Sequence, residues 1–511
     1  MLAPMTISLG EELRLEDLEA VLGPRPPRIE LCPVVLERAR ASRRVVDEVL
    51  ERGETVYGLN TGFGALAGTR IDPSRLEELQ RNLVLSHAGG LGEPLAEPLC
   101  RLMLLLRIQS LALGFSGVRE ELLTRLQSLY NADLIPVIPS QGSVGASGDL
   151  APLAHMALPL LGLGEVWAGG RSVPASRALA GAGLAPLVLA AKEGLALING
   201  TQCMTAIGVA TWLLARDLVK VADIAAALAI EALRGSAKPF DEQVQLARQQ
   251  AGQLASAANL RLLLGDSEIV VSHADCPKVQ DPYSLRCVPQ VHGAVRDALA
   301  YSDSVLRTEV NAATDNPLVF PDGRIVSAGN FHGQPVSQAL DFLGIAMSTL
   351  GAVSERRIEN LVNPSLSGLP AFLAKEPGVE SGLMVAQVAA ASLVSENKTL
   401  AHPASVDSIP TSANQEDHVS MGVTAARHAQ AITSNSGKVL GIELLAGAEA
   451  LGLDRTLKAG KGVEAAFAAV RERISASEGD RILAPLLAEA ERLASGGELI
   501  RAVEAAVGPL Q

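Results

Sequence analysis

Long segments in which apolar residues recur every three or four positions dominate the second half of the chain. Such periodicity predicts amphipathic helices that bury one face, and it extends over residues 289–311, 334–360, 383–400 and 420–449. Aromatic residues make up only 3% of the sequence, whereas Ala and Leu are frequent, a composition that favours helix packing over β-sheets. Because several long helices follow one another, we predict an all-α fold with a long antiparallel bundle.

The 511 residues are too many for one compact core, so the chain is expected to divide into domains. Compact, loop-rich sequence gives way to bundle-like sequence near Asn199. We therefore predict a loop-rich helical domain over residues 1–199 and a long helical-bundle domain over residues 200–511.

The charge balance excludes some classes of partner. The net charge is −13 and no run of Lys or Arg stands out, so we expect binding to neither nucleic acid nor an anionic membrane surface. The most apolar stretches, 150–164 and 178–191, are too short or too interrupted by Pro and Gly to span a bilayer. Their apolar residues are expected to serve buried helices or large subunit contacts.

The cysteines and the first residues indicate the compartment. Five cysteines occur without a CxxC pair, which is typical of reduced thiols rather than of a disulfide framework. The first residues lack the basic and apolar regions of a signal peptide, so a cytoplasmic protein is expected. His273, Asp275 and Cys276 could ligate a metal, but no fourth ligand follows at the usual spacing, and no metal site is predicted.

A glycine-rich stretch, QGSVGASGDLAPLAH at residues 141–155, interrupts the helical pattern. A phosphate-binding loop would need Lys and then Ser or Thr after its last glycine, where the chain has Asp149 and Leu150. A hydrolase nucleophile would need a glycine two residues after Ser147, where Asp149 stands instead. One remaining interpretation is a turn that caps the following helix, with Ser147 or Asp149 as the N-cap.

The other interpretation of this stretch is covalent. In a sufficiently tight turn the amide nitrogen of Gly148 can attack the carbonyl carbon of Ala146 and close a five-membered ring. Loss of two water molecules, one of them from the side chain of Ser147, then leaves an exocyclic methylene. Ala146 and Gly148 offer little steric hindrance. The product would be an electrophile that no ordinary side chain supplies.

The segment GSVGASGDLAPLAH resembles the signature of the aromatic amino acid ammonia-lyases. The resemblance extends in order through VYGLNTGFG, LSHAGG, LINGTQ, KVQDPYSLRCVPQ, GNFHGQP and TSANQEDHVSMG. In that family Ala-Ser-Gly cyclises by itself into 4-methylidene-imidazol-5-one (MIO). The resemblance therefore implies an MIO group formed from Ala146, Ser147 and Gly148, with no external cofactor. It also implies an all-α homotetramer in which several subunits contribute to each site.

The resemblance assigns roles to residues in the other blocks. Tyr57, in a glycine-rich loop that could close over the site, would act as the base or beside it, and a tyrosinate can do so if its pKa is lowered. Asn199 could end a helix before Gly200, while the family places its amide against the prosthetic group or the substrate amine. Phe331 would pack beside the MIO ring.

The block QDPYSLR would bind the substrate. A guanidinium group can bind a carboxylate in two places at once. The resemblance therefore assigns the carboxylate of an amino acid substrate to Arg286, with Gln280 and Tyr283 lining the site. Tyr283 is also a candidate catalytic residue.

Two polar residues indicate the substrate. His87 and Glu416 could together satisfy both nitrogens of an imidazole ring, whereas phenylalanine-selective relatives tend to carry an apolar residue and an amide there. The predicted reaction is the elimination of ammonia from L-histidine to give trans-urocanate, the first step of histidine degradation. Glu416 is also a candidate catalytic residue. Two points stay open: whether Tyr57 or Glu416 removes the β-proton, and whether the substrate amine or its ring adds to the electrophile.

Other functions fit the sequence less well. A tyrosine or phenylalanine lyase, or an aminomutase that returns the amine to the β-carbon, would not need both His87 and Glu416. The serine-loop signature of the fumarase and aspartase group is absent. An inactive helical scaffold would not need a competent residue at every matched position.

Overall fold

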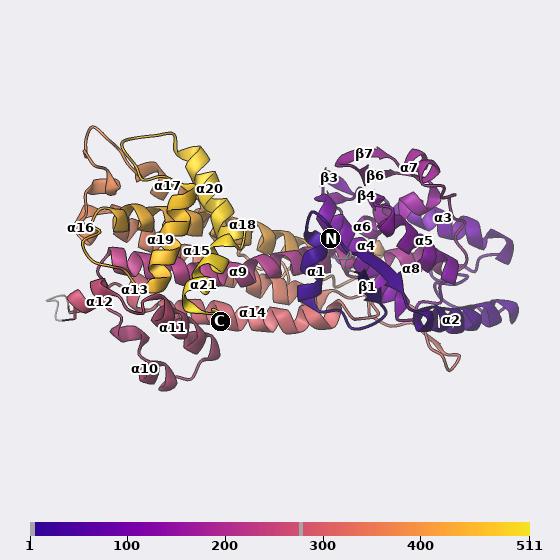
Figure 1. Ribbon diagram of the computed structural model, residues 1–511. Coiled ribbons are helices and arrows are strands. Elements are labelled where there is room, and N and C mark those ends of the chain that lie inside the picture. Colours follow the sequence, from indigo (N-terminus) through magenta and orange to yellow (C-terminus); the bar gives the residue numbers. More distant parts are fainter. Residues whose placement is uncertain (1–5, 275–278) are drawn as a thin grey trace. The chain divides into compact units, whose positions relative to one another are not determined.

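The computed structural model describes residues 6–274 and 279–511 of the chain (Figure 1). Its residues form two compact units. Unit 1 consists of Met1–Ala210, Asp303–Asp341 and Pro403–Arg427, and unit 2 consists of Thr211–Ser302, Phe342–His402 and His428–Gln511. The units are discontinuous, which differs from the predicted continuous domains 1–199 and 200–511. The chain first passes from unit 1 to unit 2 after Ala210, near the predicted boundary at Asn199. It then returns twice to unit 1, because the two later segments pack there.

Unit 1 is mainly helical. Its α2 begins at Pro33, whose fixed φ suits the first turn of a helix. Before α3, the N-cap residue Asp72 accepts a hydrogen bond from the amide of Ser74. Helices α3, α6 and α8 contact one another (Figure 1), and this group carries or adjoins most of the candidate site. The helices wholly within unit 1 are α1 (Leu15–Leu22), α2 (Pro33–Glu51), α3 (Leu76–His87), α4 (Glu97–Ala112), α5 (Glu120–Asn131), α6 (Leu150–Ala157), α7 (Ala175–Gly181) and α8 (Glu193–Ile198).

Short strands lie between the helices of unit 1. β1 and β2 are parallel, with Thr6 opposite Arg28, and the remaining pairs, β3 with β5, β4 with β6, β6 with β7 and β8 with β9, are antiparallel. The sheets are too small to change the fold class, so the all-α prediction is confirmed. The strands are β1 (Thr6–Leu9), β2 (Arg28–Leu31), β3 (Leu91–Pro94), β4 (Ile135–Pro136), β5 (Pro139–Gln141), β6 (Glu165–Ala168), β7 (Arg171–Pro174), β8 (Leu318–Val319) and β9 (Ile325–Val326).

Unit 2 is a helical bundle. Its core includes Ile358 and Leu361, Val439 and Ile442, and Ala390, which come from α15, α18 and α17. The apolar faces of these helices are therefore packed together, as their periodicity predicts. The helices wholly within unit 2 are α10 (Glu242–Leu246), α11 (Ala251–Leu263), α12 (Glu268–Ser272), α13 (Tyr283–Arg286), α16 (Pro364–Ser367), α17 (Met384–Leu400), α19 (Lys461–Arg473), α20 (Leu483–Ser495) and α21 (Glu498–Val507).

Four long helices have residues in both units. They are α9 (Gln202–Ala232), α14 (Val288–Glu309), α15 (Gln334–Val362) and α18 (Gly422–Gly452). Together with α17, the last three confirm the helices predicted at 289–311, 334–360, 383–400 and 420–449, with small differences at their ends.

One described helix, α15, is long and apolar enough to cross a membrane by length and composition alone. Within its most apolar window, 56% of the residues are buried in the structure. A buried core helix meets the same criterion, so this single helix is weak support for a membrane span.

Candidate active site

A cavity of about 730 Å³ lies within unit 1. Five of the predicted site residues line it, and they come from five separate parts of the sequence: Tyr57, His87, Ser147, Asn199 and Glu416. Most of the remaining wall is apolar, with side chains that include Phe63, Leu66, Leu79, Leu83 and Leu195. A mostly apolar pocket with a few convergent polar groups is the usual form of a small-molecule site.

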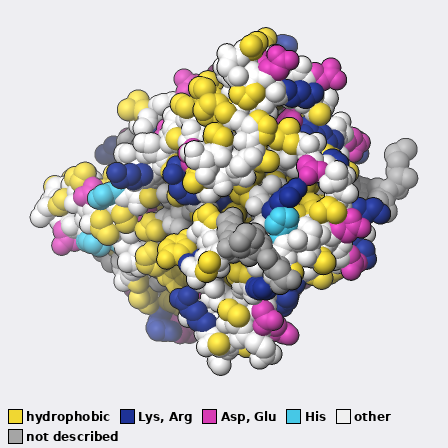
Figure 2. All heavy atoms as spheres, turned by 90° about the vertical axis from the view of Figure 1, so that its left-hand side faces the viewer, with side chains coloured by type: hydrophobic (Ala, Val, Ile, Leu, Met, Phe, Trp, Pro, Cys, Tyr) yellow, Lys and Arg dark blue, Asp and Glu magenta, His cyan; other side chains and the backbone are white. Residues whose placement is uncertain are grey.

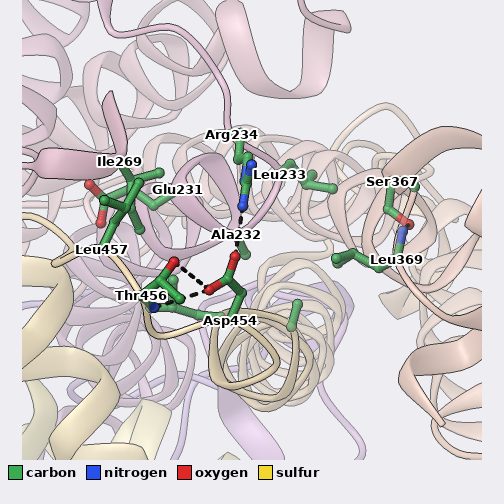
Figure 3. Close-up of a pocket in the computed structure, with 13 residues that line it drawn as sticks. Glu231, Ala232, Leu233, Arg234, Ile269, Ser367, Leu369, Asp454, Thr456 and Leu457 are labelled. Carbon is green, nitrogen blue, oxygen red and sulfur yellow. Dashed lines mark hydrogen bonds and ion pairs between the residues drawn. The ribbon is translucent and has the colours of Figure 1, made fainter. Parts of the chain in front are cut away.

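A second cavity, of about 360 Å³, lies within unit 2 (Figure 3). Its polar groups already have partners. Arg234 forms a 2.8 Å ion pair with Asp454, which also accepts hydrogen bonds from Thr456, and both carboxylate oxygens of Glu231 accept from the amide of Gly460. None of the predicted site residues lines this cavity, so the cavity of unit 1 is the candidate active site.

The turn at Ala146, Ser147 and Gly148 has the geometry that only small residues allow. Ala146 and Gly148 are paired in a bridge, and Gly148 has φ +74°. A Cβ atom at position 148 would lie 2.2 Å from the carbonyl oxygen of Gly200, and the next amide, of Asp149, donates to that oxygen at 2.6 Å. Glycine is therefore required at position 148. A closely packed, glycine-dependent turn of this kind fits the ring closure predicted for these residues.

Asp149 anchors the turn to the start of α9. Its Oδ2 accepts hydrogen bonds from the amides of Cys203 and Met204, both at 2.9 Å, and its Oδ1 accepts from the hydroxyl of Ser143 at 3.0 Å. The side chain makes no capping bond to α6, which follows it in sequence. Asp149 is thus the N-cap residue of α6 by position, as one interpretation of the sequence has it, but its carboxylate caps α9 instead. Its complete burial raises its pKa to about 7.

Buried cations support the loop on the other side of the turn. Arg107 donates to the side chain of Gln202 at 2.9 Å, to the carbonyl of Thr314 at 3.0 Å and to the carbonyl of Ala196. Lys192 forms a 2.8 Å ion pair with Asp315, and both side chains are fully buried. Buried charges need such partners. These contacts fix the end of α8, where Asn199 leads into Gly200.

Both carboxylate oxygens of Glu416 accept hydrogen bonds. The hydroxyl of Ser147 donates to Oε1 at 2.9 Å, and the hydroxyl of Thr411 donates to Oε2 at 2.6 Å. The carboxylate is thereby held beside the turn that is predicted to mature, with one oxygen bonded to the residue that would be altered.

His87 is the last residue of α3, and its contacts define its tautomer. Its Nδ1 lies 2.8 Å from the carbonyl oxygen of Leu83. Because a carbonyl oxygen only accepts, Nδ1 carries a proton. In the neutral ring Nε2 is then the unprotonated nitrogen, so His87 can accept a hydrogen bond from a ligand in the cavity.

Tyr57 lies on the cavity wall with its ring 6.4 Å from that of Phe63, measured between centroids. Burial raises its pKa, the negative charge of Glu416 raises it slightly, and a hydrogen bond from the backbone of Gly64 partly offsets both. Within unit 1 the pKa of Tyr57 is therefore raised, and not lowered as a tyrosinate would require. No Lys or Arg is among the described residues that line the cavity.

The other predicted site residues do not line this cavity. Gln280, Tyr283 and Arg286 belong to unit 2. Tyr283 is 71% exposed, and the guanidinium of Arg286 lies 4.6 Å from the centroid of its ring. Phe331 belongs to unit 1, where it is half-buried, but it is also outside the lining.

Among residues 6–274 and 279–511 there is no group of three or more His, Cys, Asp or Glu residues that could hold a metal ion. His273 pairs with Ser272 at 2.7 Å. Asp275 and Cys276 lie outside the described residues.

Arg107 and Thr411 are among the supporting residues that were not identified from the sequence. Arg107 follows five apolar residues in RLMLLLRIQSLAL, and a charge at such a position inside a helix could have indicated a buried, paired cation. Thr411 offers no such signal, because TSANQ reads as an ordinary polar loop.

Comparison with known proteins shows the family of the chain. The family described as aromatic amino acid lyase matches residues 13–472, and the chain belongs to this family. Proteins named histidine ammonia-lyase are among its relatives. That of Stigmatella aurantiaca is 53% identical over 498 residues, with 97% of this chain and 98% of the relative covered. That of Myxococcus xanthus is 52% identical over 507 residues, with 99% and 100% covered.

Solved structures have the same fold. The histidine ammonia-lyase of Trypanosoma cruzi matches with a TM-score of 0.91 and 42% identity, covering 98% of this chain and 96% of that one. A tyrosine aminomutase of Streptomyces globisporus matches with a TM-score of 0.94 and 38% identity, covering 100% of both chains.

Proposed function

We propose that this chain catalyses the non-oxidative elimination of ammonia from L-histidine to give trans-urocanate. The observation that carries the proposal is the presence of His87 and Glu416 on the wall of one cavity, beside Ser147. Relatives named histidine ammonia-lyase, at 52% and 53% identity over nearly the whole chain, support the same substrate.

The two polar residues would recognise the imidazole ring. Nε2 of His87 would accept a hydrogen bond from one ring nitrogen, and a carboxylate oxygen of Glu416 would accept from the other. Because both groups accept, they would suit a ring that is protonated on both nitrogens. Leaving either of these groups without a hydrogen-bond partner inside an apolar cavity would cost binding free energy. Substrates without ring nitrogens are thereby disfavoured.

The electrophile would come from Ala146, Ser147 and Gly148, whose close packing against Gly200 fits the cyclisation. When formed, the MIO group supplies an electrophilic methylene that assists the departure of ammonia. Asn199 lies on the same wall and is positioned to contact the group or the substrate amine. Tyr57 and Glu416 are the two candidates for receiving the proton from the β-carbon.

The substrate carboxylate requires a cation that the described cavity lining of unit 1 lacks. We assign this role to Arg286 of another copy of the chain, together with Gln280 and Tyr283. Phe331 is assigned to packing beside the MIO group. This assignment requires an oligomer with shared sites, for which the family resemblance implies a homotetramer, and a separate monomer would be inactive.

The surface of unit 2 supports association between copies. Large apolar side chains are exposed on α17, where Val385 is 60% and Val388 is 56% exposed. On the face drawn in Figure 2, hydrophobic side chains form patches, and basic and acidic side chains are interspersed between them. Apolar patches of this kind commonly mark subunit contacts, whereas a nucleic-acid-binding face would be uniformly basic. We propose a cytoplasmic enzyme without nucleic-acid or membrane partners.

An aminomutase is the second candidate, because the tyrosine aminomutase structure matches the full chain. The two functions differ in product. Purified protein is incubated with L-histidine, and urocanate is followed by its ultraviolet absorbance, with L-tyrosine and L-phenylalanine in parallel. Urocanate from L-histidine alone supports the proposal. A β-amino acid product, or turnover of only the other substrates, would overturn it.

A further inference from the structure

Residues 412–414 form a left-handed turn that contains no glycine. Ser412, Ala413 and Asn414 have φ values of +50°, +55° and +70°. Residues with a side chain rarely adopt this conformation, and three in succession are costly because each Cβ crowds the following carbonyl group. Such strain persists only where surrounding contacts enforce it, and it is concentrated at functional sites.

Thr411 and Glu416 close this turn. The amide of Thr411 donates to the carbonyl of Glu416 at 3.0 Å, and the amide of Glu416 donates to the carbonyl of Thr411 at 3.3 Å. The side chains are joined as well, because Oγ1 of Thr411 donates to Oε2 of Glu416 at 2.6 Å. Backbone and carboxylate are therefore fixed by the same residue.

The turn also packs against the loop that carries Tyr57. Gly64, at φ +53°, approaches so closely that a Cβ atom there would lie 2.5 Å from Oγ of Ser412. Gly64 lines the cavity together with Tyr57. The turn that precedes Glu416 and the loop that carries Tyr57 are therefore in direct contact.

We infer that Thr411 is a positioning residue for the elimination reaction, with a hydroxyl that holds one oxygen of Glu416 so that the other faces residue 147 and the substrate. This inference rests on the proposed function. Freed from Thr411, the Glu416 side chain would regain its other rotamers, and the carboxylate would spend less time in the productive position. Because Glu416 is also proposed to contact the imidazole ring, KM should rise as well, but less than kcat falls, since Arg286 and His87 would still bind the substrate.

The test compares Thr411→Val, which keeps the shape of the side chain but removes the hydroxyl, with Thr411→Ser, which keeps the hydroxyl. Thr124→Val is the matched control, since the Thr124 hydroxyl bonds only to carbonyls of its own helix. For each full-length variant kcat and KM for L-histidine, the Tm and the intact mass are measured.

Loss of a hydrogen bond to a charged group predicts that kcat of Thr411→Val falls at least about tenfold. Its KM should change less, and its Tm should match that of Thr124→Val. Thr411→Ser should recover kcat to within about threefold of the unaltered chain. Unchanged kcat in Thr411→Val, or an equal loss in Thr411→Ser, would overturn the inference.

Crystal structures of the unaltered chain and of Thr411→Val give a readout independent of turnover. Displacement of the Glu416 carboxylate in the variant supports the positioning role, and an unmoved carboxylate overturns it. If the unaltered chain does not convert L-histidine, the proposed function fails, while the carboxylate position still decides the role of Thr411.

Discussion

The hydroxyl of Ser147 donates a 2.9 Å hydrogen bond to Oε1 of Glu416, although 269 residues separate them in the sequence. The maturation proposed for residues 146–148 expels this hydroxyl as water. Oε1 of Glu416 then loses its donor while Oε2 keeps the hydroxyl of Thr411. Maturation would therefore also release one carboxylate oxygen for the substrate.

Replacement of Ser147 separates the proposed maturation from folding. Ser147→Ala removes the hydroxyl that must leave, so the second loss of water cannot occur. We expect a folded protein with a Tm near that of the unaltered chain and a loss of at least about a thousandfold in kcat. Circular dichroism and the histidine assay measure both. Activity equal to that of the unaltered chain would contradict the account.

His87 should determine the choice of substrate. His87→Phe removes the hydrogen-bond acceptor and adds apolar surface, so kcat/KM for L-histidine should fall about a hundredfold and that for L-phenylalanine should rise. Parallel kinetics with the two amino acids measure the ratio. An unchanged ratio would show that His87 does not contact the substrate ring.

The buried carboxyl group of Glu231, which lines the second cavity, should make the folding stability depend on pH (Figure 3). Burial raises its pKa from 4.5 to about 7. Between these values the unfolded chain releases a proton that the folded chain retains, so the folded state loses stability as the pH rises, by roughly 3 kcal/mol in all. Above pH 7 this contribution is constant.

Glu231→Gln keeps the acceptor for Gly460 and removes the titration. The Tm of the variant relative to that of the unaltered chain should therefore increase from about pH 4.5 to about pH 7 and then stay level. Thermal unfolding across this range measures the difference. A difference that does not vary with pH would contradict the assignment.

Shared sites predict complementation between inactive variants. Tyr57→Phe damages the part of the site in unit 1, and Arg286→Ala damages the part in unit 2. When the two are expressed together, some sites in the mixed oligomer receive neither substitution. Activity of the mixed oligomer should clearly exceed that of either variant alone, and activity no higher than theirs would place Arg286 and Tyr57 in the same copy.

Local sequence patterns predicted most of the fold. The long helices follow from apolar periodicity. The discontinuous units could not be predicted in this way, because the packing of residues 303–341 and 403–427 in unit 1 depends on contacts distant in sequence. The partner of Asp149 was missed for the same reason: the amides that it caps belong to α9, more than fifty residues further along the chain.

The candidate site was predictable to the extent that motifs carry it. Tyr57, His87 and Glu416 were identified from their blocks, and they line one cavity. The direction of the Tyr57 pKa depends on burial, which the sequence does not give. The role of Thr411 depends on a left-handed turn that lacks the usual glycine signal.

The intact mass of the purified chain tests the central claim most directly. If Ala146, Ser147 and Gly148 form the electrophile, the measured mass is lower than the sequence mass by two water molecules, and Ser147→Ala does not show this loss. A mass equal to that of the unmodified sequence, in a preparation that converts L-histidine to urocanate, would contradict the account.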